Sequence, residues 1–152
     1  MTDLMDKGIL IVEDEPSSRK YLSMLLSQQG YSRIYEAGNI ADCLSILSEH
    51  GEQIYLVLLD LMLPDGWGLS VMEHLVNSHD YIVGIIATTG FGNIETVRDF
   101  FQMGTDKILA MDFQPKPLSL KTLLEIVSSF FCKKGEVTGI LAGDEFLRFA
   151  SR

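Results

Sequence analysis

The chain has 152 residues, of which 47% are hydrophobic and 22% charged, a composition typical of one globular domain with its own core. Its net charge of −9 argues against direct binding to nucleic acid or to an anionic membrane, because both need basic surfaces. No apolar run approaches the roughly 20 residues of a membrane-spanning helix. The acidic first residues do not resemble a secretory signal, and Cys43 and Cys132 form no CxxC motif. We therefore expect a cytoplasmic protein with reduced thiols.

Five short apolar runs of strand length alternate with five amphipathic segments of helix length. The predicted strands, in chain order, lie at 8–12, 33–37, 55–60, 82–87 and 107–110. The predicted helices lie at 16–30, 39–51, 69–76, 93–104 and 119–131. Pro16 suits a first helical turn, and Asn39, Asn93 and Ser119 suit helix N-caps. This alternation predicts an α/β fold, a doubly wound five-stranded parallel sheet with helices on both faces.

Polar residues of particular kinds follow four of these strands. Carboxylates end the first strand, at Glu13 and Asp14, and the third, at Asp60. Thr88 and Thr89 end the fourth strand, and Lys116 lies in the loop that we expect after the fifth. In a parallel sheet all these strand ends share one edge, which is where open α/β folds place their sites. Each residue alone could be a helix-capping or solvated group, but together they predict a site.

The predicted edge has the chemistry of a phosphoryl-transfer site. Clustered carboxylates repel one another unless a cation lies between them, and Mg²⁺ prefers carboxylate and carbonyl oxygens. A carboxylate beside such a cation can attack phosphorus as a nucleophile, while a hydroxyl and an ammonium group donate to the phosphoryl oxygens. The residue types therefore favour formation of an aspartyl phosphate on Asp60, with Mg²⁺ as cofactor.

The residues that carry this site also resemble a known family, the receiver domain of two-component response regulators, which has a flavodoxin-like fold. The matching segments are 9–16, 58–68, 85–92 and 116–118. The resemblance implies that Asp60 accepts a phosphoryl group from a histidine kinase or phosphotransfer protein. It implies that Glu13, Asp14, Asp60 and the backbone carbonyl of Met62 bind Mg²⁺. A threonine and Lys116 would contact the phosphoryl group.

The resemblance also implies an organisation and a set of partners. We expect a receiver domain at 1–132 and a C-terminal extension, a short helix or linker, at 133–152. The chain would act as a signalling switch on a downstream protein or on an output domain in trans. A homodimer would use the fourth helix, fifth strand and fifth helix. We expect no conventional enzyme activity beyond self-phosphorylation from a phosphodonor and autodephosphorylation at Asp60.

Two details of the match are open. Thr88 and Thr89 are adjacent, and the register set by Gly90-Phe91-Gly92 favours Thr89 as the phosphoryl-contacting hydroxyl. The segment from Gly104 to Lys116 is several residues longer than the family pattern. One alignment makes 107–110 the fifth strand and 111–115 an insertion. The other makes 111–114 the strand, which puts Phe113 at the position of the family's switch aromatic.

Three other functions compete with the signalling switch. A Mg²⁺-dependent phosphatase with an aspartyl nucleophile usually has a second Asp two residues later, where this chain has Met62. A pseudo-receiver that acts as a phosphorylation-independent interaction module would keep the fold and lose the chemistry. A nucleotide-binding protein is disfavoured, because the acidic loop after the first strand lacks phosphate-cradling glycines.

Overall fold

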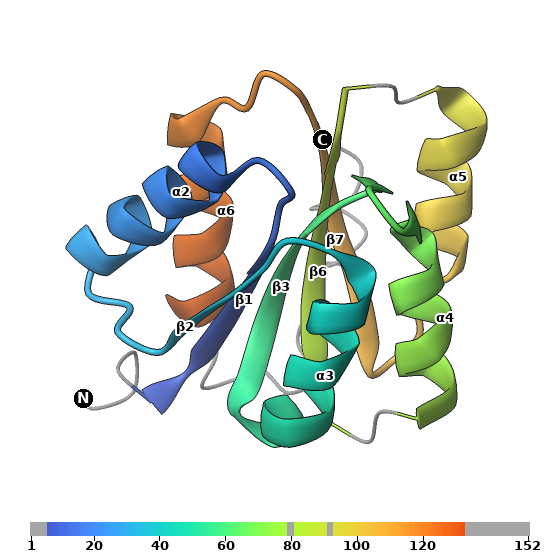
Figure 1. The fold of residues 1–152 in the computed structure, drawn as a ribbon, viewed down its shortest axis with the longest axis horizontal. Coiled ribbons are helices and arrows are strands. Elements are labelled where there is room, and N and C mark those ends of the chain that lie inside the picture. Colours follow the sequence, from blue (N-terminus) through green and yellow to red (C-terminus); the bar gives the residue numbers. More distant parts are fainter. Residues whose placement is uncertain (1–5, 79–80, 91–92, 133–152) are drawn as a thin grey trace.

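The computed structural model describes residues 6–78, 81–90 and 93–132, and a five-stranded parallel sheet lies at their centre (Figure 1). The sheet has the order β2-β1-β3-β6-β7. Its strands are β1 (Gly8–Val12), β2 (Ile34–Ala37), β3 (Ile54–Asp60), β6 (Val83–Thr89) and β7 (Ile108–Pro115). The predicted fold class is confirmed. The predicted boundary between 132 and 133 stays a prediction, since residues 133–152 lie outside the described residues.

Helices cover both faces of the sheet (Figure 1). Helices α2 (Pro16–Gln28) and α6 (Leu120–Cys132) cover one face, and α3 (Ile40–His50), α4 (Leu69–Ser78) and α5 (Ile94–Gln102) cover the other. On β3, Leu56 and Leu58 pack towards α2 and α6, whereas Val57 and Leu59 pack towards the opposite helices. Because both of its faces are buried, β3 is apolar along its whole length until Asp60.

The predicted caps begin their helices as expected. The side chain of Asn39 accepts a hydrogen bond from the backbone of Asp42 at 2.7 Å, and that of Asn93 accepts one from Thr96 at 2.8 Å. The Ser119 hydroxyl accepts one from the Thr122 backbone at 3.3 Å. Such caps satisfy backbone N–H groups that the first helical turn leaves without a partner. Local sequence therefore determines where three of the five helices start.

Strand β7 differs from both alignments of the segment 104–116. It runs without interruption from Ile108 to Pro115, so Met111–Pro115 is not an insertion beyond the strand. The strand also begins before Met111, so the second alignment is right about 111–114 and wrong about the start. Its pairing with β6 shifts between Ile85 and Ile86, where Ala110 is followed in register by Asp112.

The shift is a β-bulge at Met111, and it decides which face Phe113 occupies. Ala110 packs towards α3, α4 and α5, and Met111 packs towards α2 and α6. A regular strand would then return Phe113 to the α2 and α6 face, since side chains alternate with a period of two. The extra residue instead brings Phe113 into register with Ala87 and against Phe100 of α5, with ring centroids 6.0 Å apart.

A short hairpin follows Asp60. Strands β4 (Met62–Leu63) and β5 (Gly66–Trp67) pair antiparallel, and Gly66 has a φ of 151°, which favours glycine. A single 3-10 turn, η1 (Gly51–Gln53), joins α3 to β3. Among residues 6–78, 81–90 and 93–132, no helix has both the length and the apolar character that a bilayer crossing requires.

Candidate functional site

Asp60 is the last residue of β3 and is almost completely buried, with 3% of its surface exposed. Its carboxylate has two partners of different kinds. Oδ1 accepts a hydrogen bond from the backbone of Met62 at 2.9 Å, and Oδ2 accepts one from Lys116 Nζ at 2.8 Å. A buried carboxylate is stable only when its charge is paired and its oxygens are hydrogen-bonded. Asp60 therefore has two roles: its Oδ1 caps the turn that follows β3, and its Oδ2 forms an ion pair with Lys116.

Lys116 joins the ends of four strands. It directly follows β7, and its ammonium group donates to Asp60 on β3 and, at 2.9 Å, to Oε1 of Glu13 just after β1. Its backbone N–H donates to the carbonyl of Thr89 at 2.9 Å, which holds the backbone of Lys116 beside the end of β6. Burial opposes the charge of Lys116, but the hydrogen bonds to Asp60 and Glu13 outweigh it and raise the pKa of the ammonium group. The two carboxylates thus stabilise the charged form of Lys116 at this edge.

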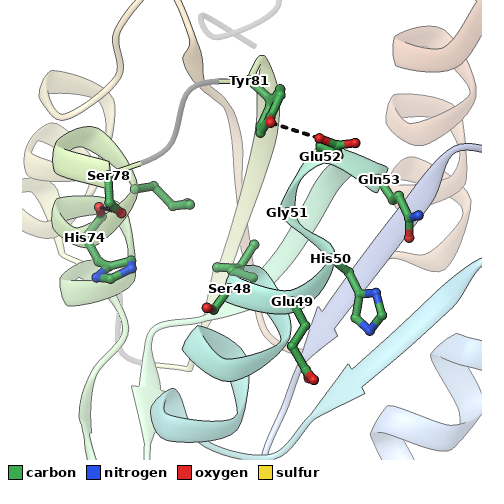
Figure 2. Close-up of a pocket in the computed structure, with 11 residues that line it drawn as sticks. Ser48, Glu49, His50, Gly51, Glu52, Gln53, His74, Ser78 and Tyr81 are labelled. Atoms are coloured by element: carbon green, nitrogen blue, oxygen red, sulfur yellow. Dashed lines mark hydrogen bonds between the residues drawn. The ribbon is translucent and has the colours of Figure 1, made fainter.

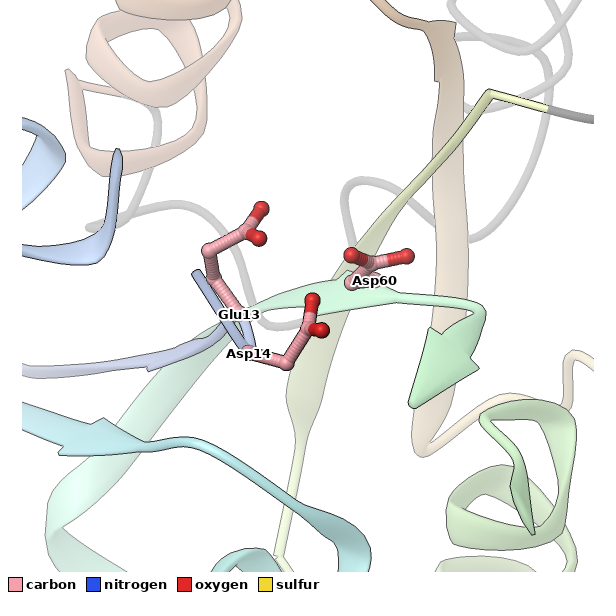
Figure 3. A group of neighbouring side chains, drawn as sticks. All are labelled: Glu13, Asp14 and Asp60. Atoms are coloured by element: carbon pink, nitrogen blue, oxygen red, sulfur yellow. The ribbon is translucent and has the colours of Figure 1, made fainter. Parts of the chain in front are cut away.

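The three predicted acidic residues come together at the carboxyl edge of the sheet (Figure 3). One carboxylate oxygen of each of Glu13, Asp14 and Asp60 lies within 4.8 Å of the others. Lys116 offsets one of the three negative charges, so an excess of two negative charges remains. Oxygen ligands with that excess charge suit a hard divalent cation. The residues present therefore fit Mg²⁺, with Asp14, exposed at the rim, as the accessible ligand.

The three acidic residues after β1 have different roles, some at the acidic cluster and one at the start of α2. Glu15 is the N-cap of α2: its side chain accepts from the Ser18 backbone at 2.7 Å and from the Ser17 hydroxyl at 2.8 Å. Hydrogen bonds from Ser17 and Ser18 lower the pKa of Glu15 to about 2. The negative charge of Glu15 therefore lies at the N-terminus of α2, where it interacts favourably with the helix dipole. Glu13, whose Oε2 also accepts from the Glu15 backbone N–H at 3.1 Å, and Asp14 belong to the acidic group at the edge, which the run of acids alone did not distinguish.

The two threonines of β6 differ in register. Thr88 pairs with Asp60, and its carbonyl accepts from Leu61 at 2.9 Å. Thr89, which is 0% exposed, pairs with Pro115 immediately before Lys116. Both are therefore at the correct edge of the sheet, and the choice of Thr89 stays a prediction. Met62, whose backbone carbonyl is the predicted fourth metal ligand, lies on β4 two residues beyond Asp60.

Two residues of the loop after Asp60 support the site and were not singled out from the sequence. Gly68 passes so close to β3 that a Cβ atom there would lie 2.5 Å from the Asp60 carbonyl oxygen. The Asp65 carboxylate accepts from the backbone N–H groups of Ile40 and Ala41 at 2.8 and 3.0 Å, which ties the hairpin to the start of α3. The pair of glycines at 66 and 68 could have indicated the close approach at Gly68. Nothing in the local sequence indicates that Asp65 contacts the start of α3.

A second concave region, of about 640 Å³, lies at the opposite, amino end of the sheet (Figure 2). It is lined by the end of α3, η1, α4 and Tyr81, whose hydroxyl donates to Glu52 at 2.9 Å. His50 and His74 belong to it and come from different helices, α3 and α4, and the His50 ring stacks on Tyr35 with centroids 4.8 Å apart. Of the residues that the structure describes, only Glu13, Asp14 and Asp60 form a group able to hold a metal. This pocket is therefore not a competing metal centre.

Comparisons with known proteins agree with this geometry. Residues 9–128 match the family model described as the response regulator receiver domain. The chain is 31% identical over 127 residues to the transcriptional regulatory protein DpiA of Escherichia coli (strain K12). That match covers 83% of this chain and 53% of DpiA, so the chain spans about half the length of this relative.

Solved structures have the same fold. The non-phosphorylated HemR receiver domain from Leptospira biflexa superposes with a TM-score of 0.72 at 28% identity, covering 82% of this chain and 94% of that one. The CheX-CheY-BeF3-Mg+2 complex from Borrelia burgdorferi contains a chain with a TM-score of 0.70 at 23% identity, covering 82% and 89%. Because the family model matches residues 9–128, which are most of this chain, the chain belongs to the response regulator receiver domains.

Proposed function

We propose that this receiver domain is a phosphorylation-dependent switch that accepts a phosphoryl group on Asp60, with Mg²⁺ bound by Glu13, Asp14, Asp60 and the Met62 carbonyl. The single observation that carries the proposal is the double ion pair of Lys116, which holds Asp60 and Glu13 together at the end of the sheet. With Asp14 close by, this arrangement supports the proposal, because one ammonium group and three carboxylates then lie around one point.

In this proposal each residue has a separate task. A carboxylate oxygen of Asp60 attacks phosphorus, and a P–O bond forms while the bond from phosphorus to the donor breaks. The leaving group, a histidine nitrogen of a kinase or phosphotransfer protein, or acetate from acetyl phosphate, takes the electron pair. Lys116 and the Thr89 hydroxyl donate to the phosphoryl oxygens. Mg²⁺, when bound, neutralises charge on those oxygens.

The proposed output is a change at β7 and α5. Thr89 would move towards the phosphoryl group, and Phe113, which packs against Phe100, would respond to the space that it leaves. The response would reach a downstream protein or an output domain in trans, through a surface that includes α5, β7 and α6, which a homodimer would also use. The cytoplasm is the proposed location, consistent with Cys43, a free thiol whose pKa burial raises to about 12.

The test is intact-protein mass spectrometry after incubation with acetyl phosphate, with and without Mg²⁺. We expect one added phosphoryl group in the wild type and in Asp106→Asn, an exposed control far from the site. We expect none in Asp60→Asn and none without Mg²⁺. Labelling that persists in Asp60→Asn contradicts the assignment of the acceptor. Absence of any adduct in the wild type favours the interaction module that needs no phosphorylation.

The same samples separate the remaining alternatives. Thr89→Val should alter the rate of phosphorylation or the lifetime of the adduct more than Thr88→Val does; the reverse order would assign the hydroxyl to Thr88. Steady turnover of p-nitrophenyl phosphate would indicate a phosphatase instead. We expect none, because Met62 occupies the position of that enzyme's general acid/base and cannot transfer a proton.

A further inference from the structure

Arg19 of α2 joins the acidic loop to β2, and nothing in the site described above uses it. Its Nη1 donates to the backbone carbonyl of Glu13 at 2.7 Å, and its Nε lies 3.4 Å from Oε1 of Glu36. The side chains of Arg19 and Glu36 are 22% and 29% exposed, so this ion pair is partly screened from water. A planar guanidinium group can hold two partners at fixed angles, which a lysine cannot.

The surrounding backbone is shaped for this guanidinium group. Gly38, one residue beyond β2, lies beside it, and a Cβ atom at that position would be 3.0 Å from Arg19 Nη1. That distance is too short for a comfortable contact, so a side chain at residue 38 would displace the guanidinium group by a few tenths of an ångström. Gly38 and Glu36 thus determine where Arg19 lies, and Arg19 in turn holds the Glu13 carbonyl.

The held carbonyl controls the direction of Asp14. The Glu13 N–H already donates to Ala37 of β2 at 3.0 Å, so the bond from Arg19 fixes the next peptide as well. Because a peptide unit is planar, orienting the Glu13 carbonyl also orients the backbone of Asp14. Within the part of the chain that the structure describes, the Asp14 carboxylate makes no hydrogen bond or ion pair that would orient it directly. Its placement in the acidic cluster therefore depends on this backbone.

We propose that Arg19 is a positioning residue for the cation site, which acts through the Glu13–Asp14 peptide and is itself held by Glu36 and Gly38. This inference rests on the proposed function, because it assumes that the acidic cluster binds Mg²⁺. Arg19 is not a ligand. Residues that orient metal ligands in this way typically change metal affinity about 10- to 100-fold when they are removed.

The sign of the effect separates positioning from simple electrostatics. A positive charge near the cluster repels Mg²⁺, so removal of that charge without any structural role should raise Mg²⁺ affinity. Removal of a positioning residue should lower it, because Asp14 loses its direction. Lys20 provides the matched control: it is the next residue of α2, is exposed, and carries the same charge.

The experiment is isothermal titration of the full chain with MgCl₂, with thermal denaturation to check folding. We expect Arg19→Met to lower Mg²⁺ affinity about 10-fold, Arg19→Lys to lower it less, and Lys20→Met to leave it unchanged or slightly raised. Gly38→Ala and Glu36→Gln keep Arg19 but change the contacts that hold its guanidinium group. Both should therefore also lower the Mg²⁺ affinity. These two variants keep the test valid if Arg19→Met folds poorly.

Two outcomes would overturn the inference, and they are distinguishable. Equal Mg²⁺ affinities in Arg19→Met and Lys20→Met, or a higher affinity in Arg19→Met, would overturn the role of Arg19 alone. A wild-type chain that binds no Mg²⁺ would overturn the cation site of the proposed function, and the role of Arg19 with it.

Discussion

The acidic edge of the sheet and the middle of β7 are neighbouring regions that differ in how far sequence determines them. At the edge, Asp60 ends β3, and Glu13 and Lys116 directly follow β1 and β7. The fold brings the Lys116 ammonium group within 2.9 Å of Glu13 and 2.8 Å of Asp60. In the middle of β7, neither alignment of the segment before Lys116 described the strand that the structure contains. The two regions are joined, since β7 ends at the residue before Lys116.

The difference lies in what decides each arrangement. A charged residue at the end of an apolar strand has one stable place, at the edge of the sheet, because burial along the strand would leave its charge unpaired. A bulge inside an apolar strand is decided by neighbours that are distant in sequence. Met111 fills the space above Gly84 beside Phe130. The residues next to Met111 in sequence do not predict that this space exists.

The largest expected effect comes from Gly68→Ala, which tests whether the acidic edge also depends on tertiary packing. The added Cβ would lie 2.5 Å from the Asp60 carbonyl oxygen and 2.8 Å from Leu61 Cα, both backbone atoms that cannot move aside. We expect a loss of about 3 kcal/mol in unfolding free energy, measured by urea denaturation. The control is Gly90→Ala, where the structure has nothing within 4 Å of the new atom. Equal stabilities of the two variants would contradict the close approach.

A somewhat smaller loss is expected for Met111→Ala, which tests the packing that holds the bulge. Met111 is 0% exposed, and its truncation should cost about 2–3 kcal/mol. Gly84→Ala alone should also destabilise the protein, because the new Cβ would collide with Met111 Sδ. In the Met111→Ala background the same substitution should cost less, since the collision with Met111 is removed and only the contact with Phe130, 3.1 Å from the new atom, remains tight. Strictly additive losses in a double-mutant cycle would show that the two positions do not share this space.

Lys116→Met tests the link between the two regions. The variant leaves Asp60 and Glu13 without their shared cation, and we expect a loss of about 1–2 kcal/mol in stability at neutral pH. The raised pKa of Lys116 means that its contribution is complete below the unfolded value of 10.5 and declines as the pH rises through the folded value. The stability difference between wild type and variant should therefore shrink in strong alkali.

Mg²⁺ provides the second readout for Lys116→Met. Because the variant's cluster lacks a positive charge, added MgCl₂ should raise its melting temperature more than that of the wild type. Lys121→Met, an exposed residue of α6, is the charge-matched control. A wild-type response as large as that of the variant would mean that Lys116 does not compete with a cation for the carboxylates.

The smallest effect is expected from Asp65→Asn, which loosens the hairpin beside the site. The backbone N–H groups of Ile40 and Ala41 lower the pKa of Asp65 below 3.8. A lowered pKa gives stability that is present above the unfolded pKa and is lost as the pH falls through the folded one. The melting temperature should therefore be lower in Asp65→Asn than in wild type at neutral pH, with the difference vanishing in acid. Asp106→Asn, a change at an exposed residue, should leave the melting temperature at neutral pH as in wild type.

The sequence by itself determined the alternation of the five sheet strands and five helices along the chain, three helix N-caps and the residues that gather at the carboxyl edge. These features are local. A continuous apolar run forms a strand that is covered on both faces, and Asn and Ser side chains accept hydrogen bonds from the first N–H groups of a helix. Charged residues occur where an apolar strand ends. The same logic places Glu13, Asp14, Asp60 and Lys116 on one edge of the sheet.

Only the tertiary structure decided the bulge at Met111, the face of Phe113, and the supports provided by Arg19, Asp65 and Gly68. Each depends on a contact between segments far apart in the chain, such as Asp65 with the start of α3 or Gly68 with the Asp60 carbonyl. A residue type does not reveal which distant backbone atom will lie beside it. Packing therefore decided how the site is held, whereas the strand ends already determined which groups it contains.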